Sequence, residues 1–199
     1  MQTALPGQDR EVHSIELLLD TATDAAVRRA WQELADAGLP SQARHTGETN
    51  APHVTLAARP VIEADTDDEL ASLAATLPEP VWLGSLVVFG RGPRGLVLAR
   101  LVVPSRGILR LHEQVHEIAP DPDGSESTNT LPAQWTPHVT LASRLTLDEI
   151  GRAVDVAAAD PHDGEFTTLR RWDSTTRRVT LLGGGRDGDD RDAGAGLRR

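Results

Sequence analysis

The chain of 199 residues contains no cysteine and no lysine, and all 20 of its basic residues are arginine. The lack of cysteine excludes disulfide bonds, thiol nucleophiles and cysteine-ligated metal sites. The lack of lysine excludes a P-loop and any lysine nucleophile that is adenylated or forms a Schiff base. Any phosphate group that the protein binds must therefore be held by arginine, hydroxyl groups, imidazoles or backbone N–H groups.

Aromatic residues are also scarce, with no tyrosine, two phenylalanines and four tryptophans. An extended aromatic platform for long RNA is therefore not expected. No apolar run has membrane-spanning length, and residues 1–11 lack the basic and apolar regions of a signal peptide, so we expect a cytoplasmic protein without a membrane partner. The net charge of −10 argues against a protein that coats nucleic acid through bulk electrostatics, although it is compatible with a local arginine-lined groove.

The hexapeptide Pro-His-Val-Thr-Leu-Ala occurs twice, at Pro52–Ala57 and at Pro137–Ala142, and an arginine follows each copy after one intervening residue. Because a β-strand has a period of two, we expect His, Thr, the final Ala and Arg on one face and Val and Leu on the other. Each copy then presents an imidazole, a hydroxyl and a guanidinium on one surface. Two such strands would supply two acid/base groups and two hydroxyls to one site.

The repeat extends beyond the hexapeptide. Thr66-Asp-Asp-Glu69 and Thr146-Leu-Asp-Glu149 both have the pattern of a capping box that opens an amphipathic helix. The sequence further predicts strands at Val12–Asp20, Val81–Phe89, Gly95–Val103, Glu165–Trp172 and Arg178–Leu182, and helices at Asp24–Ala37 and Ser105–Ala119. Each half thus has the order strand–helix–strand–helix–strand, with the Gly-rich turn Gly90–Gly95 as the junction.

This duplicated order predicts an α+β fold in a single domain over residues 1–183. One lobe is expected at about residues 11–90 and a pseudo-symmetric second lobe at about residues 95–183, with a central groove between them. Asp121–Thr130 is expected to be a polar loop. Residues 184–199 are rich in Gly, Asp and Arg, and this composition is typical of a disordered tail.

The paired motifs His53-Val-Thr55-Leu56 and His138-Val-Thr140-Leu141 resemble those of the two-histidine phosphoesterases, usually grouped as the 2′-5′ RNA ligase family. The resemblance covers roughly Val12 to Leu182. It implies two similar lobes whose motif strands meet in a groove. It also implies that His53 and His138 are the general acid and base, and that Thr55 and Thr140 hold phosphate oxygens.

The arginines after the motifs, Arg59 and Arg144, are further candidates for binding the phosphate. In this family an arginine often lies five residues after the second histidine. Here that position is Ser143 and Arg144 comes one residue later, which keeps Arg144 on the histidine face if the strand is regular. Trp135 is a candidate for stacking a nucleobase, or else is buried, and Arg44 either lines the groove or lies on a hairpin.

The chemistry that the resemblance implies is the opening of a 2′,3′-cyclic phosphate. The reaction needs a base for water and an acid for the departing ribose oxygen, and imidazole serves both roles near neutral pH. No metal or other cofactor is required, and the same site could join a cyclic phosphate end to a hydroxyl. We therefore expect a metal-independent cyclic phosphodiesterase or 2′-5′ RNA ligase for nucleotides or RNA ends. By resemblance to relatives that leave a 2′-phosphate, His53 is expected to be the acid and His138 the base. The protein is expected to be a monomer without an obligatory protein partner.

Two other hypotheses stay open. A non-catalytic module that binds nucleotides or RNA ends would use the same surface, although binding alone needs no pair of titrating groups. His112-Glu113-Gln-Val-His116 has the His-Glu-x-x-His spacing of zinc metallopeptidases. No pattern for a third ligand follows it, and the apolar residues around it are those of an ordinary amphipathic helix, so we expect no metal site.

Overall fold

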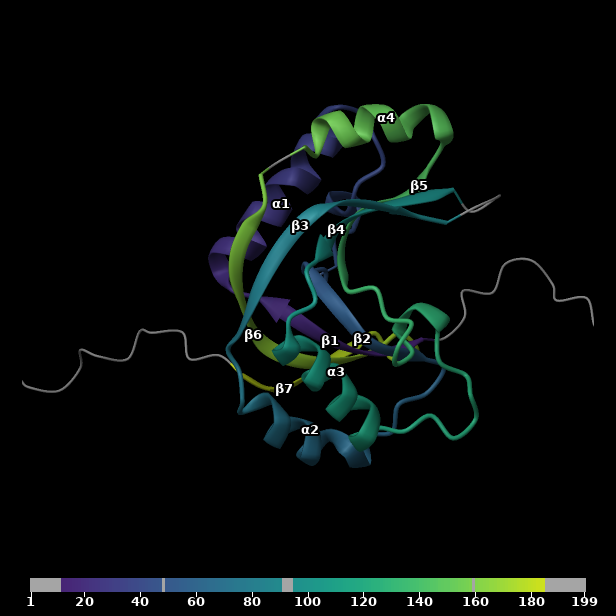
Figure 1. Ribbon diagram of the computed structural model, residues 1–199. Helices are drawn as coiled ribbons and strands as arrows, with labels where there is room; N and C mark the ends of the chain where they lie inside the picture. The colour runs from purple at the N-terminus through teal and green to yellow at the C-terminus, as the bar shows by residue number, and fades with distance from the viewer. Residues whose placement is uncertain (1–11, 48, 91–94, 159, 185–199) are drawn as a thin grey trace, which may run out of the picture.

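The computed structural model of the protein describes residues 12–47, 49–90, 95–158 and 160–184. Within these residues seven strands form one antiparallel sheet, with four α-helices and three short 3-10 helices packed around it (Figure 1). The elements in chain order are β1 (His13–Leu19), α1 (Thr21–Asp36), η1 (Gln42–Arg44), β2 (His53–Arg59), η2 (Ala64–Thr66), α2 (Asp67–Ala74), β3 (Glu79–Phe89), β4 (Leu96–Val102), α3 (Arg106–Ile118), η3 (Thr128–Thr130), β5 (His138–Leu145), α4 (Leu147–Val156), β6 (His162–Asp173) and β7 (Arg178–Gly184).

The predicted α+β class is confirmed, and each predicted strand and helix is present with small shifts at its ends. The two predicted capping boxes behave differently. Thr146 has extended backbone and forms a complete capping box with Glu149. Thr66 has helical backbone, because it is the last residue of the 3-10 turn η2, and its side chain makes no cap bond. An N-cap side chain reaches the first turn from an extended conformation, so Thr66 cannot cap α2 in this way.

The strand order in the sheet is β2-β1-β6-β3-β4-β5, and β7 also pairs with β6. The long strand β6 lies in the middle of this order and connects its two halves. Its first residues pair with β3, and its later residues pair with β1 and β7. Helices α2 and α3 pack near β7 and β2, whereas α1 and α4 pack near β5 and β4 (Figure 1). The motif strands β2 and β5 stand at the two ends of this order and still contact one another, so the sheet curves back on itself.

The expected division at residues 90–95 does not separate two packed lobes. Strands β3 and β4 on either side of it pair directly, and β6 and β7 from the second half pair with β1 from the first or with each other. The helices are exchanged as well, since α1 contacts β5 and α3 contacts β2. Each lobe therefore takes elements from both halves of the sequence. Residues 91–94 of the predicted turn and residues 185–199 of the predicted tail lie outside the described residues.

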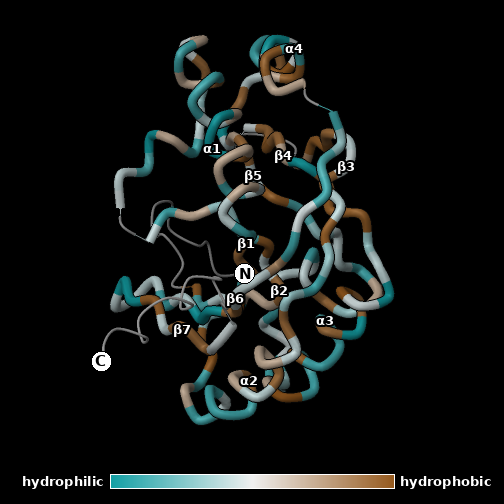
Figure 2. The backbone as a smooth tube through the Cα atoms, turned by 90° about the vertical axis from the view of Figure 1, so that its left-hand side faces the viewer, coloured by the Kyte–Doolittle hydropathy of each residue, from teal (hydrophilic) through white to brown (hydrophobic). Residues whose placement is uncertain are grey.

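The core is formed by the apolar side chains of the strands and the inner faces of the helices, and strands β1, β4 and β5 carry hydrophobic stretches in Figure 2. Three helices end at an alanine whose carbonyl accepts a hydrogen bond from an arginine. These pairs are Arg152 with Ala37, Arg59 with Ala119, and Arg100 with Ala157. A cation at a helix C-terminus binds the free carbonyls and complements the helix dipole. No helix in the described part of the chain is long and apolar enough to cross a membrane.

Candidate active site

The two motif histidines begin their strands in the same way. His53 is the first residue of β2 and His138 is the first residue of β5. The Nδ1 atom of each ring lies at hydrogen-bond distance from the carbonyl two residues earlier, 2.7 Å from Ala51 O and 2.6 Å from Thr136 O. A carbonyl only accepts, so Nδ1 carries the proton on both rings and Nε2 is left for a substrate or a proton.

Each motif strand contains a β-bulge at the same residue of the hexapeptide. In β2, Ala57 pairs with Ile15 and Thr55 pairs with Glu16, so Leu56 is the extra residue. In β5, Ala142 pairs with Leu98 and Thr140 pairs with Ala99, so Leu141 is the extra residue. A bulge places two residues opposite one and shifts the alternation of side chains by one position.

The consequence of this shift is visible in the burial of the hexapeptide. His and Thr are half-buried in both copies, whereas Leu and the Ala after it are both fully buried. The side-chain face that begins at the histidine therefore ends at the threonine. Beyond the bulge it is the fifth position after the histidine, Ala58 or Ser143, that is half-buried.

His53 lies beside a buried carboxylate. Its Nε2 is 3.6 Å from Oε1 of Glu16, which is 4% exposed. Burial alone would raise the pKa of Glu16, but the charges of His53 and Arg170 and hydrogen bonds from Ser14 and Arg170 lower it. Glu16 is therefore ionised near neutral pH, and its charge acts on His53.

His138 has an apolar neighbour instead. Its ring packs against Phe89, with the ring centroids 4.6 Å apart and the planes inclined at 45°. Burial lowers the pKa of His138, and the charge of His53 lowers it further, against the opposing effect of the hydrogen bond to Thr136. The strands β2 and β5 that carry the two imidazoles contact one another, and a shared site for both rings stays a prediction.

The model that describes the 2′-5′ RNA ligase superfamily matches residues 19–178 of this chain. The chain belongs to the 2′-5′ RNA ligase superfamily. The resemblance to the two-histidine phosphoesterases is thereby confirmed, and membership of the superfamily supports a phosphoesterase type of activity.

Three solved structures are similar to this superfamily member. The crystal structure of E. coli LigT complexed with 3′-AMP is 17% identical and has a TM-score of 0.49, covering 88% of this chain and 96% of that one. A structure described as a phosphoesterase is 18% identical with a TM-score of 0.49, covering 87% and 94%. The crystal structure of TT0787 of Thermus thermophilus is 17% identical with a TM-score of 0.49, covering 86% and 95%. No curated protein matches the chain.

The two threonines of the repeated motif are held in place by hydrogen bonds to their backbone carbonyls. Thr55 and Thr140 are both half-buried, two residues after their histidines. The carbonyl of Thr55 accepts a hydrogen bond from the indole of Trp135 (3.0 Å), and the carbonyl of Thr140 accepts one from Trp31 (2.9 Å). The tryptophans thus support the two strands at the positions where the candidate phosphate ligands lie.

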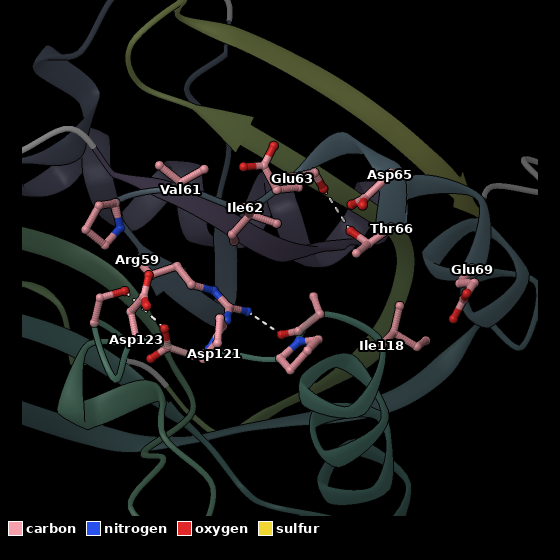
Figure 3. A pocket seen from close by; sticks show the side chains of 15 residues that line it. Arg59, Val61, Ile62, Glu63, Asp65, Thr66, Glu69, Ile118, Asp121 and Asp123 are labelled. Carbon is pink, nitrogen blue, oxygen red and sulfur yellow. Dashed lines mark hydrogen bonds between the residues drawn. The ribbon is translucent and has the colours of Figure 1, made fainter.

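Arg59 does not lie on the face of His53, and that prediction is wrong. Its side chain is 4% exposed, its Nη2 donates to the carbonyl of Ala119, and its Nε lies 3.3 Å from Oε2 of the buried Glu126. Figure 3 shows Arg59 near Asp121 at a cavity of about 590 Å³, and neither His53 nor His138 lines this cavity. The physical reason is the bulge at Leu56, which shifts the later side chains of β2 by one position.

Arg144 is affected by the same shift and by a second irregularity. Its backbone has a φ of 65°, its side chain is exposed, and the pairing of β5 with β4 is irregular between Leu96 and Leu98. The regular strand that would have placed Arg144 beside His138 is absent. Its contact with a phosphate stays a prediction.

Trp135 and Arg44, the two candidates for contacts with the nucleoside, have different surroundings. One ring face of Trp135 stacks on His112, with centroids 4.1 Å apart and planes inclined at 4°, so this face is not open to a nucleobase. Trp135 also packs against the hydrophobic core. Arg44 is exposed in η1, which contacts β5, and its role stays a prediction.

The His-Glu-x-x-His pair holds a loop against β2. His112 Nε2 lies 2.8 Å from the carbonyl of Thr130, and His116 Nε2 lies 3.0 Å from Thr130 O and 3.2 Å from Leu56 O. The Leu56 carbonyl belongs to the bulge, so an imidazole N–H takes the place of a ladder hydrogen bond there. Glu113 is exposed. Among the described residues no group of three or more His, Asp or Glu side chains could hold a metal ion.

Sequence reasoning missed Glu16, Ser14, Arg170 and Phe89. Ser14 and Glu16 are polar residues at alternate positions of an otherwise apolar strand, and this alternation is a signal that one strand face meets a polar site. Their partner Arg170 could not be found in this way, because the pairing of β1 with β6 spans more than 150 residues.

Proposed function

We propose that this superfamily member is a metal-independent phosphodiesterase that hydrolyses 2′,3′-cyclic phosphates on nucleotides or at RNA ends. The observation that carries the proposal is the pair of imidazoles held by two identical hexapeptides. Both bind the backbone through Nδ1, so Nε2 is the nitrogen that can exchange a proton with a substrate, and the charge of His53 acts on His138. Two such groups supply the acid and the base that the reaction needs.

The unequal surroundings of the histidines support different roles for them. Because burial and the charge of His53 lower the pKa of His138, its ring is neutral near pH 7 and is the better base. His53 lies beside the buried carboxylate of Glu16, 3.6 Å from its Nε2, and takes the acid role because His138 serves as the base.

In the proposed reaction His138 Nε2 takes a proton from water as the water oxygen bonds to phosphorus. The bond between phosphorus and the ribose 3′ oxygen breaks, and His53 Nε2 gives its proton to that oxygen, which leaves a 2′-phosphate. The hydroxyls of Thr55 and Thr140 donate hydrogen bonds to the non-bridging oxygens as their charge grows. If a ribose 5′ hydroxyl attacks phosphorus in place of water, the same steps form a 2′-5′ linkage and release the 3′ hydroxyl. Both histidines come from one chain, so the reaction requires no partner protein.

A panel of substrates in EDTA tests the proposal. Purified protein is incubated with adenosine and cytidine 2′,3′-cyclic phosphate and with an RNA oligonucleotide that ends in a 2′,3′-cyclic phosphate, and the products are identified by ³¹P NMR. We expect 2′-phosphates without added metal. His53→Ala and His138→Ala should each lower kcat by about 10²- to 10⁴-fold.

His162→Gln is the matched control, because His162 lies at the start of β6 and its Nε2 contacts the hydroxyl of Thr23 in α1. Calorimetric binding without turnover would favour the non-catalytic nucleotide-binding module. Activity that EDTA abolishes and zinc restores would overturn the two-histidine mechanism.

A further inference from the structure

We propose that Glu16 is a positioning residue that keeps His53 protonated, and that its pairing with Arg170 assigns the acid role to His53 in an otherwise symmetric site. The inference rests on the proposed function, and it adds to it the feature that makes two copies of one motif act differently. It is carried by the contacts of Glu16 and by the strand register on the two sides of the site.

Glu16 is fixed from two directions inside the sheet. Its Oε2 accepts hydrogen bonds from Nε and Nη2 of Arg170, both at 2.7 Å, and its Oε1 accepts one from Ser14 at 2.6 Å. The register places Glu16 directly between Thr55 of β2 and Arg170 of β6. Both charged side chains are more than nine-tenths buried. A buried carboxylate held in this way has no freedom to turn away from His53.

The distance between Glu16 and His53 suits an electrostatic role. At 3.6 Å, Glu16 Oε1 is too far from Nε2 for a hydrogen bond but close enough for strong attraction between opposite charges. The Nδ1 proton is already bound to Ala51 O. The carboxylate therefore stabilises the imidazolium while the Nε2 proton stays available for a leaving oxygen.

The second copy of the motif has no carboxylate at the equivalent position of the register. Thr55 pairs with Glu16 across β1, and the equivalent Thr140 pairs with Ala99 across β4. Ala99 is fully buried and carries no charge, and the ring beside His138 is Phe89. A single difference at equivalent positions of the register, glutamate against alanine, thus separates the two histidines electrostatically.

Other charged groups near His53 do not cancel this effect. Arg170 binds Oε2 of Glu16, whereas the other carboxylate oxygen, Oε1, is the one that faces His53. Arg28 of α1 donates to the carbonyl of Asn50, three residues before His53, and is itself paired with Asp24. The remaining neighbour, His138, is neutral in its role as the base.

The first test follows the histidine ring protons by NMR during a pH titration of the substrate-free protein, and it compares wild type with Glu16→Gln. We expect the His53 titration midpoint to fall by about one pH unit or more in Glu16→Gln, because an opposite charge at this distance shifts a titration by about 1–3 units. Glu16→Asp keeps the charge and should restore most of the shift.

Asp67→Asn is the matched control. Asp67 binds the neighbouring residue of β6, Arg171, through two hydrogen bonds of 2.8 and 2.7 Å, so this variant removes the same type of pair. It should leave the His53 midpoint unchanged. An equal midpoint in wild type and Glu16→Gln would overturn the inference, and this result would not depend on any enzymatic activity.

The second test uses a cyclic substrate with sulfur in place of the 3′ oxygen, since a thiolate leaves without needing a proton. Glu16→Gln should lower kcat at least tenfold on the oxygen substrate, leave KM nearly unchanged, and have little effect on the sulfur substrate. An equal loss on both substrates would show that Glu16 does not act through the acid. Absence of turnover in the wild type would instead refute the proposed function and leave the NMR result intact.

Discussion

The indole of Trp31 in α1 donates a hydrogen bond to the carbonyl of Thr140 in β5, 2.9 Å away and 109 residues later in the chain. Trp135 makes the reverse connection, from just before β5 to the carbonyl of Thr55 in β2. Each half of the sequence therefore supports the motif strand of the other half. This exchange, together with the shared strand β6, links each motif strand to both halves of the chain.

The threonine hydroxyls are expected to act mainly in the transition state. Thr55→Val and Thr140→Val keep the size of the side chain and remove the donor, so each should lower kcat by about 10²- to 10³-fold with a smaller effect on KM. Steady-state kinetics on a nucleoside 2′,3′-cyclic phosphate measures this. Thr→Ser at the same positions keeps the hydroxyl and should retain most of the activity. A pure rise in KM would mean that the hydroxyls bind the ground state equally well.

The pH dependence should reflect the lowered pKa of His138. As the base, His138 must be neutral, so the acidic limb of kcat/KM should lie below the ordinary histidine value of about 6.5. The basic limb should report loss of the proton from the acid, and the limbs together belong to a coupled pair. An acidic limb above the ordinary value would contradict the assignment of His138.

The same pKa shift has a consequence for stability. The folded state binds the proton of His138 less readily than the unfolded chain does, and burial has the same effect on the pKa of His112. The free energy of unfolding should therefore fall as the pH decreases below about 6.5. Urea unfolding at pH 7.5 and at pH 5.5 measures this change, and replacement of His138 by Gln should make the dependence weaker.

Arg59 is expected to contribute to stability rather than to catalysis. Arg59→Met leaves the buried Glu126 without its charged partner and removes the bond to Ala119, so the free energy of unfolding should fall by about 3–5 kcal/mol. The double variant Arg59→Met/Glu126→Gln removes both charges, keeps an acceptor for Ala58 N–H and the Thr130 hydroxyl, and should recover much of this loss. Its kcat on a cyclic phosphate should equal that of the wild type; a large loss of kcat in the stable double variant would restore Arg59 as a phosphate ligand.

The pair His112 and His116 is expected to be structural. His112→Ala should lower the free energy of unfolding by about 1–3 kcal/mol, because the buried carbonyl of Thr130 loses a donor and Trp135 loses its stacking partner. Added zinc should raise neither the melting temperature nor the activity of the wild type. A zinc-dependent rise in melting temperature that His116→Gln removes would instead show a metal site there.

The hexapeptide repeat was sufficient to predict two matching strands and the family to which the chain belongs. The helix and strand positions also followed from local patterns, since periodicity and N-cap residues such as Asp20 and Ser105 act over a few residues. The lack of lysine by itself limited the possible phosphate ligands to arginine, hydroxyl, imidazole and backbone N–H groups. These features depend on local sequence and composition, and these are what periodicity and motifs describe.

The tertiary structure decided which side chains share the site. The bulges at Leu56 and Leu141 arise from pairing with β1 and β4, so a regular period of two misplaced Arg59. The partners of Glu16 and Trp31 come from strands more than 100 residues away. The lobes exchange helices because each amphipathic face packs on whichever strands the folded sheet brings to it. Such contacts follow from long-range register and packing, and neither is encoded in the spacing of residues along the chain.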